Sequence, residues 1–163
     1  MVLGACSEGP NAWLSTANLT GATYLTESTD AGEVTLEAGG YRQALAPGSA
    51  SAAAIRLERW SAGDLDGAGR AAAAVIIIDH PGGSDRFAHL HALLSRDGEW
   101  VDAEFAFPGD RLRIERVPVQ AAAITVAMRE RRSDTPSAEP RTIPVIRRFR
   151  LEWGSLVELA LDD

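Results

Sequence analysis

Residues 75–78 form an unbroken run of β-branched side chains, one valine and three isoleucines, with glycine-rich segments before and after it. A run of this length without a polar residue offers no polar face to the solvent, so it is typical of a strand that is buried on both faces. The sequence therefore predicts a central strand here, in the middle of a sheet.

Apolar and polar side chains alternate in most of the remaining segments. Residues 100–107 place apolar side chains at every second position and put Asp102 and Glu104 on the opposite face. Because the side chains of a strand alternate between its two faces, this period predicts half-buried strands. Gly154 and Ser155 are expected to form a two-residue turn between the last two strands. The predicted strands are residues 23–26, 33–37, 53–60, 75–78, 85–94, 100–107, 124–129, 145–153 and 156–161.

The spacing of these segments, roughly 8 to 15 residues, favours an antiparallel β sandwich or barrel of about nine strands over alternating strands and helices. At most one or two short helices are expected, the first at residues 11–17. The alanines of residues 50–60 also suit a helix, and a helix there would make the fold α+β. A chain of 163 residues suits a single domain. We expect an N-terminal tether at residues 1–20 and one β-rich domain at residues 21–163.

The chain is acidic, with 16 basic and 23 acidic side chains and a formal net charge of -7, and every basic residue is an arginine. This balance argues against nucleic acid as a partner, because phosphate binding rests on a basic surface. Two arginine groups, residues 129–132 and 147–150, could bind an anionic surface. We expect them instead to be solvated strand ends, with Arg147 interrupting the apolar face of its strand.

The single cysteine, Cys6, excludes an internal disulfide and a cysteine-based zinc cluster. The sequence Leu-Gly-Ala-Cys at residues 3–6 is similar to the lipobox of bacterial lipoproteins, in which small residues precede the lipidated cysteine. The alternative is an ordinary exposed thiol at a frayed terminus. A lipobox also needs a hydrophobic segment ahead of it, which we expect to be encoded upstream of Met1. The sequence contains no run of about 18 apolar residues, which is the length that a membrane-spanning helix would need.

Two groups of residues are candidate metal ligands. His89 and His91 are two apart on a predicted strand, so both imidazoles project from one face, and His80 or Asp79 could supply a third ligand for zinc or copper. Asp64 and Asp66 have the first two ligand spacings of a calcium loop, but that loop has too few further oxygen ligands. We favour a polar histidine pair and a glycine turn in which the aspartates accept backbone N–H bonds, and we expect no cofactor.

No catalytic constellation is predicted. Ser84 follows Gly82 and Gly83, but a nucleophile elbow would read Gly-x-Ser-x-Gly, and here Asp85 follows the serine. A phosphate loop is excluded as well, because it usually needs a lysine and the chain has none.

The order of three short motifs resembles a family of bacterial secreted proteins and lipoproteins that has no assigned activity and in which some members carry a META-type domain. The motifs are Gly-Asp-Leu-Asp-Gly at residues 63–67, Gly-Gly-Ser-x-x-Phe at residues 82–87 and Gly-Asp-Arg at residues 109–111. Ala68 and Asp85 replace an acid and a glycine of the family pattern, and the loop at residues 133–141 lacks the cysteines of some relatives. The resemblance implies a β-rich fold and an envelope location, and it supports lipidation of Cys6.

These observations predict a non-enzymatic module of the bacterial envelope, periplasmic or at the cell surface, that binds a protein or an envelope component. It would touch the membrane only through a lipid on Cys6. Two alternatives remain: a metal-binding protein that uses the histidine pair, and a barrel-type carrier of a small apolar ligand, which would need a sizeable apolar cavity.

Overall fold

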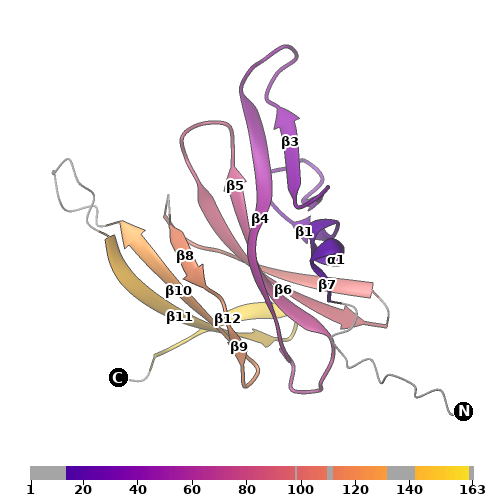
Figure 1. The fold of residues 1–163 in the computed structure, drawn as a ribbon, viewed down its shortest axis with the longest axis vertical. Coiled ribbons are helices and arrows are strands. Elements are labelled where there is room, and N and C mark those ends of the chain that lie inside the picture. Colours follow the sequence, from indigo (N-terminus) through magenta and orange to yellow (C-terminus); the bar gives the residue numbers. More distant parts are fainter. Residues whose placement is uncertain (1–13, 98, 110–111, 132–141, 162–163) are drawn as a thin grey trace, which may run out of the picture.

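The computed structural model describes residues 14–97, 99–109, 112–131 and 142–161. These residues form twelve strands and one short helix, α1 (Thr16–Thr20), so the mostly β prediction is confirmed. Figure 1 shows three layers: an outer sheet, a central sheet and an N-terminal layer. The single helix of the described residues is far too short to cross a membrane.

All pairings are antiparallel. The central sheet has the order β3 (Gly40–Ala44), β4 (Ala52–Ala62), β5 (Ala72–His80), β6 (Phe87–Arg96), β7 (Glu99–Ala106). The outer sheet has the order β12 (Ser155–Leu159), β11 (Thr142–Glu152), β10 (Ala123–Arg131), β8 (Arg113–Arg116), and β9 (Val119–Gln120) also pairs with β10. The N-terminal layer contains α1 and the pair β1 (Thr23–Leu25) and β2 (Glu33–Thr35).

The predicted central strand lies in β5, the middle strand of the central sheet, and only its last residue is not buried. Ile76 packs toward the outer sheet in a cluster with Ile124, while the neighbouring Val75 packs toward the N-terminal layer in a cluster with Leu19. Because successive side chains point to opposite faces, both faces of β5 are covered by protein.

The ambiguous residues 50–60 belong to a strand. β4 pairs with β5 along most of its length, and Ile55 is buried where the alternating pattern placed it. Alanine has a high helix propensity, but the ladder bonds to β5 and the burial of one face outweigh it. The α+β alternative is therefore wrong.

Several boundaries differ from the prediction. The nine predicted strands do not include the short strands β3, β8 and β9, because runs of two to five residues carry too little periodicity. The helix was expected at residues 11–17, of which residues 11–13 lie outside the described part, and it is found at Thr16–Thr20. Leu14 and Leu19 are buried in the second cluster, so the folded part starts before residue 21.

The last turn also differs. Glu152 pairs with Ser155, so the two-residue turn is Trp153–Gly154 and not residues 154–155. Both residues have positive φ, 51° and 82°, as a type I′ hairpin turn requires. The prediction placed Gly154 at the first position of the turn, whereas in the type I′ turn of the structure it occupies the second position.

Candidate functional site

The predicted histidine pair lies between the central sheet and the N-terminal layer. His91 is 1% exposed, its Nδ1 lies 2.8 Å from a carboxylate oxygen of Asp102, and the ring of Tyr24 meets it edge-on at 5.3 Å. Nδ1 of His89 lies 2.6 Å from Glu104. Asp102 also accepts a hydrogen bond from the backbone N–H of Leu25 in β1, so this pair helps to attach the N-terminal layer to the central sheet.

Tyr24 is held by the same cluster. Its hydroxyl donates to the carbonyl of Leu19 over 2.8 Å. Burial, together with the nearby carboxylate of Asp102, raises the pKa of Tyr24 far above its ordinary value. The hydroxyl therefore stays protonated as a structural donor.

The three histidines are not brought together. His80 lies at the end of β5, on the same face as Ile78 and Ala88, whereas His89 and His91 point from the opposite face of the sheet. Across the described ranges, no three histidine, cysteine or acidic side chains are close enough to hold a metal ion. Cys6, the predicted lipidation site, lies outside the described residues.

The aspartates of the glycine turn bind their own backbone, as favoured above. Asp64 accepts hydrogen bonds from the N–H groups of Gly67 and Gly69 at 2.7 and 3.0 Å, and Asp66 accepts one from Ala68 at 2.8 Å. Burial alone would raise the pKa of Asp66, but the Ala68 bond and the guanidinium of Arg70 outweigh it and lower that pKa below its ordinary value. These oxygens thus hold the turn together.

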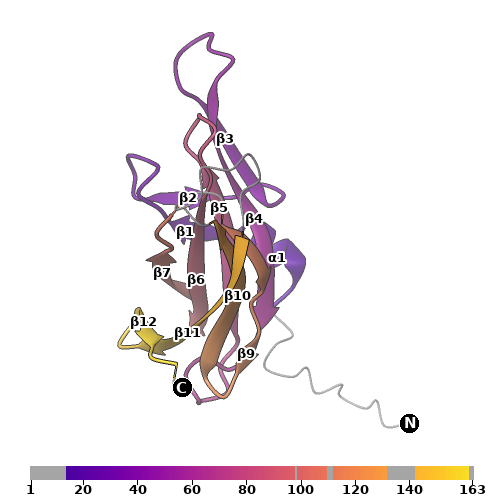
Figure 2. The same ribbon diagram turned by 90° about the vertical axis from the view of Figure 1, so that its left-hand side faces the viewer.

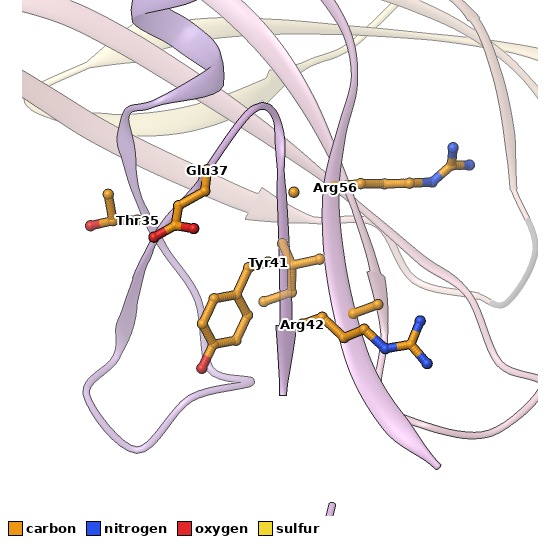
Figure 3. Close-up of a pocket in the computed structure, with 8 residues that line it drawn as sticks. Thr35, Glu37, Tyr41, Arg42 and Arg56 are labelled. Carbon is orange, nitrogen blue, oxygen red and sulfur yellow. The ribbon is translucent and has the colours of Figure 1, made fainter. Parts of the chain in front are cut away.

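The largest of the surface hollows described here, about 670 Å³, lies at the free edge of β3. Figure 3 shows that its polar side chains do not converge: Glu37 and Tyr41 lie on one side of the β3–β4 hairpin, while Arg42 and Arg56 extend away from the other. The register explains this, because Tyr41 pairs with Ile55 and the neighbouring Arg42 belongs to the opposite face. We do not assign a function to this groove.

The strongest charged feature is on the outer sheet. Its inner face packs on the central sheet, and no described element covers its outer face (Figure 1); Figure 2 views the molecule from this side. Alternation places arginines from three strands on the outer face, which we call the arginine face. Its arginines are Arg113 and Arg116 from β8, Arg129 and Arg131 from β10, and Arg148 and Arg150 from β11.

Few of these charges are neutralised. Glu115 accepts a hydrogen bond from Arg129 at 2.8 Å, and Glu152 lies 3.9 Å from Arg150. The side chains of the other four arginines make no ion pair or hydrogen bond with a described residue. Arg113 stands directly opposite Arg129, a cross-strand pair of like charges that destabilises a sheet. The arginine face thus carries a positive excess in a chain whose net charge is -7.

Arg147 does not belong to this face. It points inward, where its Nε lies 2.9 Å from Oε1 of Glu158 in an ion pair and its guanidinium lies 5.9 and 5.8 Å from the ring centres of Phe105 and Phe107. This arrangement explains the arginine in an otherwise apolar face: a counter-ion and two aromatic rings accommodate the charge.

Sequence reasoning found Arg129, Arg131, Arg148 and Arg150 but took them for solvated strand ends, and it missed Arg113 and Arg116. These two lie in β8, which was not among the nine predicted strands, and their place beside β10 depends on a register shift between Ala127 and Met128. No sequence signal marks that shift. No family model matches the chain, and neither curated proteins nor solved structures gave a match.

Proposed function

We propose that this chain is a non-enzymatic module of the bacterial envelope that is tethered by a lipid on Cys6 and docks through its arginine face onto an anionic membrane surface. The arginine face thus adds a second membrane contact to the lipid, which the sequence alone had suggested as the single one. The observation that carries the proposal is the gathering of six arginines from three strands on one open sheet face. The envelope location is supported by the lipobox-like residues 3–6 and by the family resemblance.

The shape of the face suits an extended surface better than a small ligand. From Arg131 to the level of Arg150 the arginines span about 27 Å along the strands, at about 3.4 Å for each residue. Two exposed apolar side chains lie among them, Ile146 at 51% and Val157 at 40% exposure. A broad face with cations and a few apolar side chains is typical of a surface that lies against lipid headgroups.

The expected strength explains why a tether is needed. Each arginine near an anionic bilayer contributes about 1 kcal/mol, so the four unpaired arginines give about 4 kcal/mol, which is close to millimolar affinity. A lipid on Cys6 would hold the domain near the membrane at a millimolar effective concentration, which is comparable to this affinity. The lipid and the arginine face together would then be sufficient for stable membrane binding.

The overall acidity of the chain does not oppose this docking. The Debye length at physiological ionic strength is about 8 Å, and stacked sheets are about 10 Å apart. Acidic groups beyond the central sheet are therefore screened from a membrane that touches the arginine face.

Vesicle binding tests the proposal. The protein is titrated with vesicles of phosphatidylglycerol and phosphatidylcholine, and with phosphatidylcholine alone, and the bound fraction is measured by sedimentation at low and physiological salt. We expect binding only to the anionic vesicles, with a loss at higher salt. Binding to neither vesicle at low salt, or equal binding to both, would contradict the proposal.

Two matched variants locate the contact. Arg113→Gln/Arg148→Gln removes two arginines of the arginine face, and Arg42→Gln/Arg56→Gln removes two exposed arginines from the far hairpin, with the same change in net charge. We expect the first variant to lose most of its binding and the second to keep it. Equal losses would mean that net charge alone matters.

The tether has its own test. The native gene, including its upstream region, is expressed in a bacterial host, and the N-terminus of the product is analysed by mass spectrometry. We expect a protein that begins at a lipid-modified Cys6. An uncleaved, unmodified product would remove the tether from the proposal.

A further inference from the structure

A second hollow, of about 330 Å³, opens at the end of the sandwich, between the two sheets. Val101 and Ala103 contribute to it from the inner face of the central sheet, and Leu151 contributes from the inner face of the outer sheet. These side chains have the orientation of core residues, yet Val101 is 41% exposed. The sandwich is thus left open here, with an apolar wall on each side.

Trp153 lies at the rim of this opening, and both its backbone conformation and the exposure of its side chain are unfavourable. It occupies the first position of the β11–β12 turn with φ at 51°, a conformation that bulky residues avoid. Its side chain is 104% exposed, so no packing within the described residues offsets the strain. Strained residues cluster at active sites and ligand-binding positions, and Trp153 is the one large side chain among the described non-glycine residues with positive φ.

The opening also contains a cation, Arg96, that forms no ion pair with the described residues although Glu99 stands opposite it in the register. Arg70 is paired with Asp66, which is in turn fixed by the backbone of the glycine turn. Arg96, on the last residue of β6, lines the same hollow, and its side chain has no ion pair or hydrogen bond to a described residue. An apolar cleft with a fully exposed tryptophan and a single free guanidinium therefore lies at the mouth of the sandwich.

We propose that this mouth is a binding site for a small amphipathic monocarboxylate. The carboxylate binds the guanidinium of Arg96, and the apolar body lies between Val101 and the ring of Trp153. One guanidinium matches one carboxylate through two parallel hydrogen bonds, whereas a doubly charged phosphate ester would keep an unmatched charge. A volume of about 330 Å³ lies at the lower end of small-molecule sites, which limits the ligand to a short chain or a single ring system.

The site is independent of membrane docking. Its apolar residues lie on the inner faces of the two sheets, whereas the arginine face is the outer surface of one of them. Either proposal can therefore fail while the other stands.

Calorimetric titration with octanoate tests the site, with octan-1-ol and octylamine as the neutral and cationic counterparts of equal chain length. We expect saturable binding of octanoate, weaker binding of octan-1-ol and no binding of octylamine. Arg96→Gln is expected to weaken octanoate about tenfold, as the loss of a charged hydrogen bond does, and to leave octan-1-ol unchanged.

Trp153→Asn separates binding from folding, because asparagine is well suited to this turn and the variant is expected to stay folded. It should bind octanoate several-fold more weakly than the parent protein, while Arg42→Gln, far from the mouth, should bind normally. The proposal is overturned if octanoate does not bind at millimolar concentration, if octylamine binds equally well, or if Arg96→Gln and Trp153→Asn both keep the parent affinity.

Discussion

Replacement of Trp153 by asparagine is expected to stabilise the protein. The turn Trp153–Gly154 is of type I′, with φ at 51° and 82°, and Asn-Gly is the preferred pair for such a turn. A left-handed backbone costs a residue other than glycine, asparagine or aspartate about 1 to 2 kcal/mol. The fully exposed indole ring contributes no burial that would be lost. The free energy of unfolding should therefore rise by about 1 kcal/mol, and the midpoint of thermal unfolding by about 2 to 4 °C.

Urea unfolding followed by circular dichroism measures this change, with two controls. Trp153→Ala keeps the Cβ strain and should differ little from the parent protein. Gly154→Ala introduces a Cβ at φ 82° and should destabilise the protein by about 1 kcal/mol or more. If Trp153→Asn lowers the free energy of unfolding by 1 kcal/mol or more, the tryptophan ring stabilises the fold and the inference from strain to binding is refuted.

Three further results are expected. The pKa of Asp66 is lower in the folded protein than in the unfolded chain, so the ionised carboxylate stabilises the fold. This contribution is complete above the ordinary carboxyl pKa of about 3.9 and is lost as the pH falls through the lower pKa of the folded protein. The free energy of unfolding should therefore decline below about pH 4, and Asp66→Asn should flatten that decline. Asp102→Ala should cost about 3 kcal/mol in urea unfolding, because it leaves the buried His91 and the N–H of Leu25 without their partner; a cost below 1 kcal/mol would show that the pair is not needed. Protein purified without a histidine tag and treated with zinc, copper or calcium should retain no stoichiometric metal in elemental analysis, and a metal content near one per chain would restore the metal-binding alternative.

The architecture followed from the sequence wherever burial imposes a period. Residues 75–78 have no polar side chain, and the structure places them in the middle strand with protein on both faces. The alternation around Ile55 likewise predicted its burial better than the helix propensity of the surrounding alanines did. Burial of a whole strand face contributes enough free energy that the spacing of apolar residues in the sequence reflects it.

The candidate sites could not be predicted in the same way, because they depend on which strands become neighbours. The arginine face joins Arg113 to Arg148 through β10, across a register shift that no residue pattern indicates. The backbone conformation of Trp153 could not be predicted either. The turn was expected at residues 154–155, and its actual place one residue earlier gives Trp153 a positive φ. The prediction for Arg147 was incomplete for a related reason: Glu158 and the two phenylalanine rings that accommodate it come from other strands.

The role of the arginine face is tested most directly by one ratio, the partition coefficient of Arg42→Gln/Arg56→Gln on phosphatidylglycerol vesicles divided by that of Arg113→Gln/Arg148→Gln. Both variants have the same net charge, so the ratio isolates the position of the lost arginines. At about 1 kcal/mol for each arginine near the bilayer, we expect a ratio of about 30. A ratio near one would contradict docking through the arginine face.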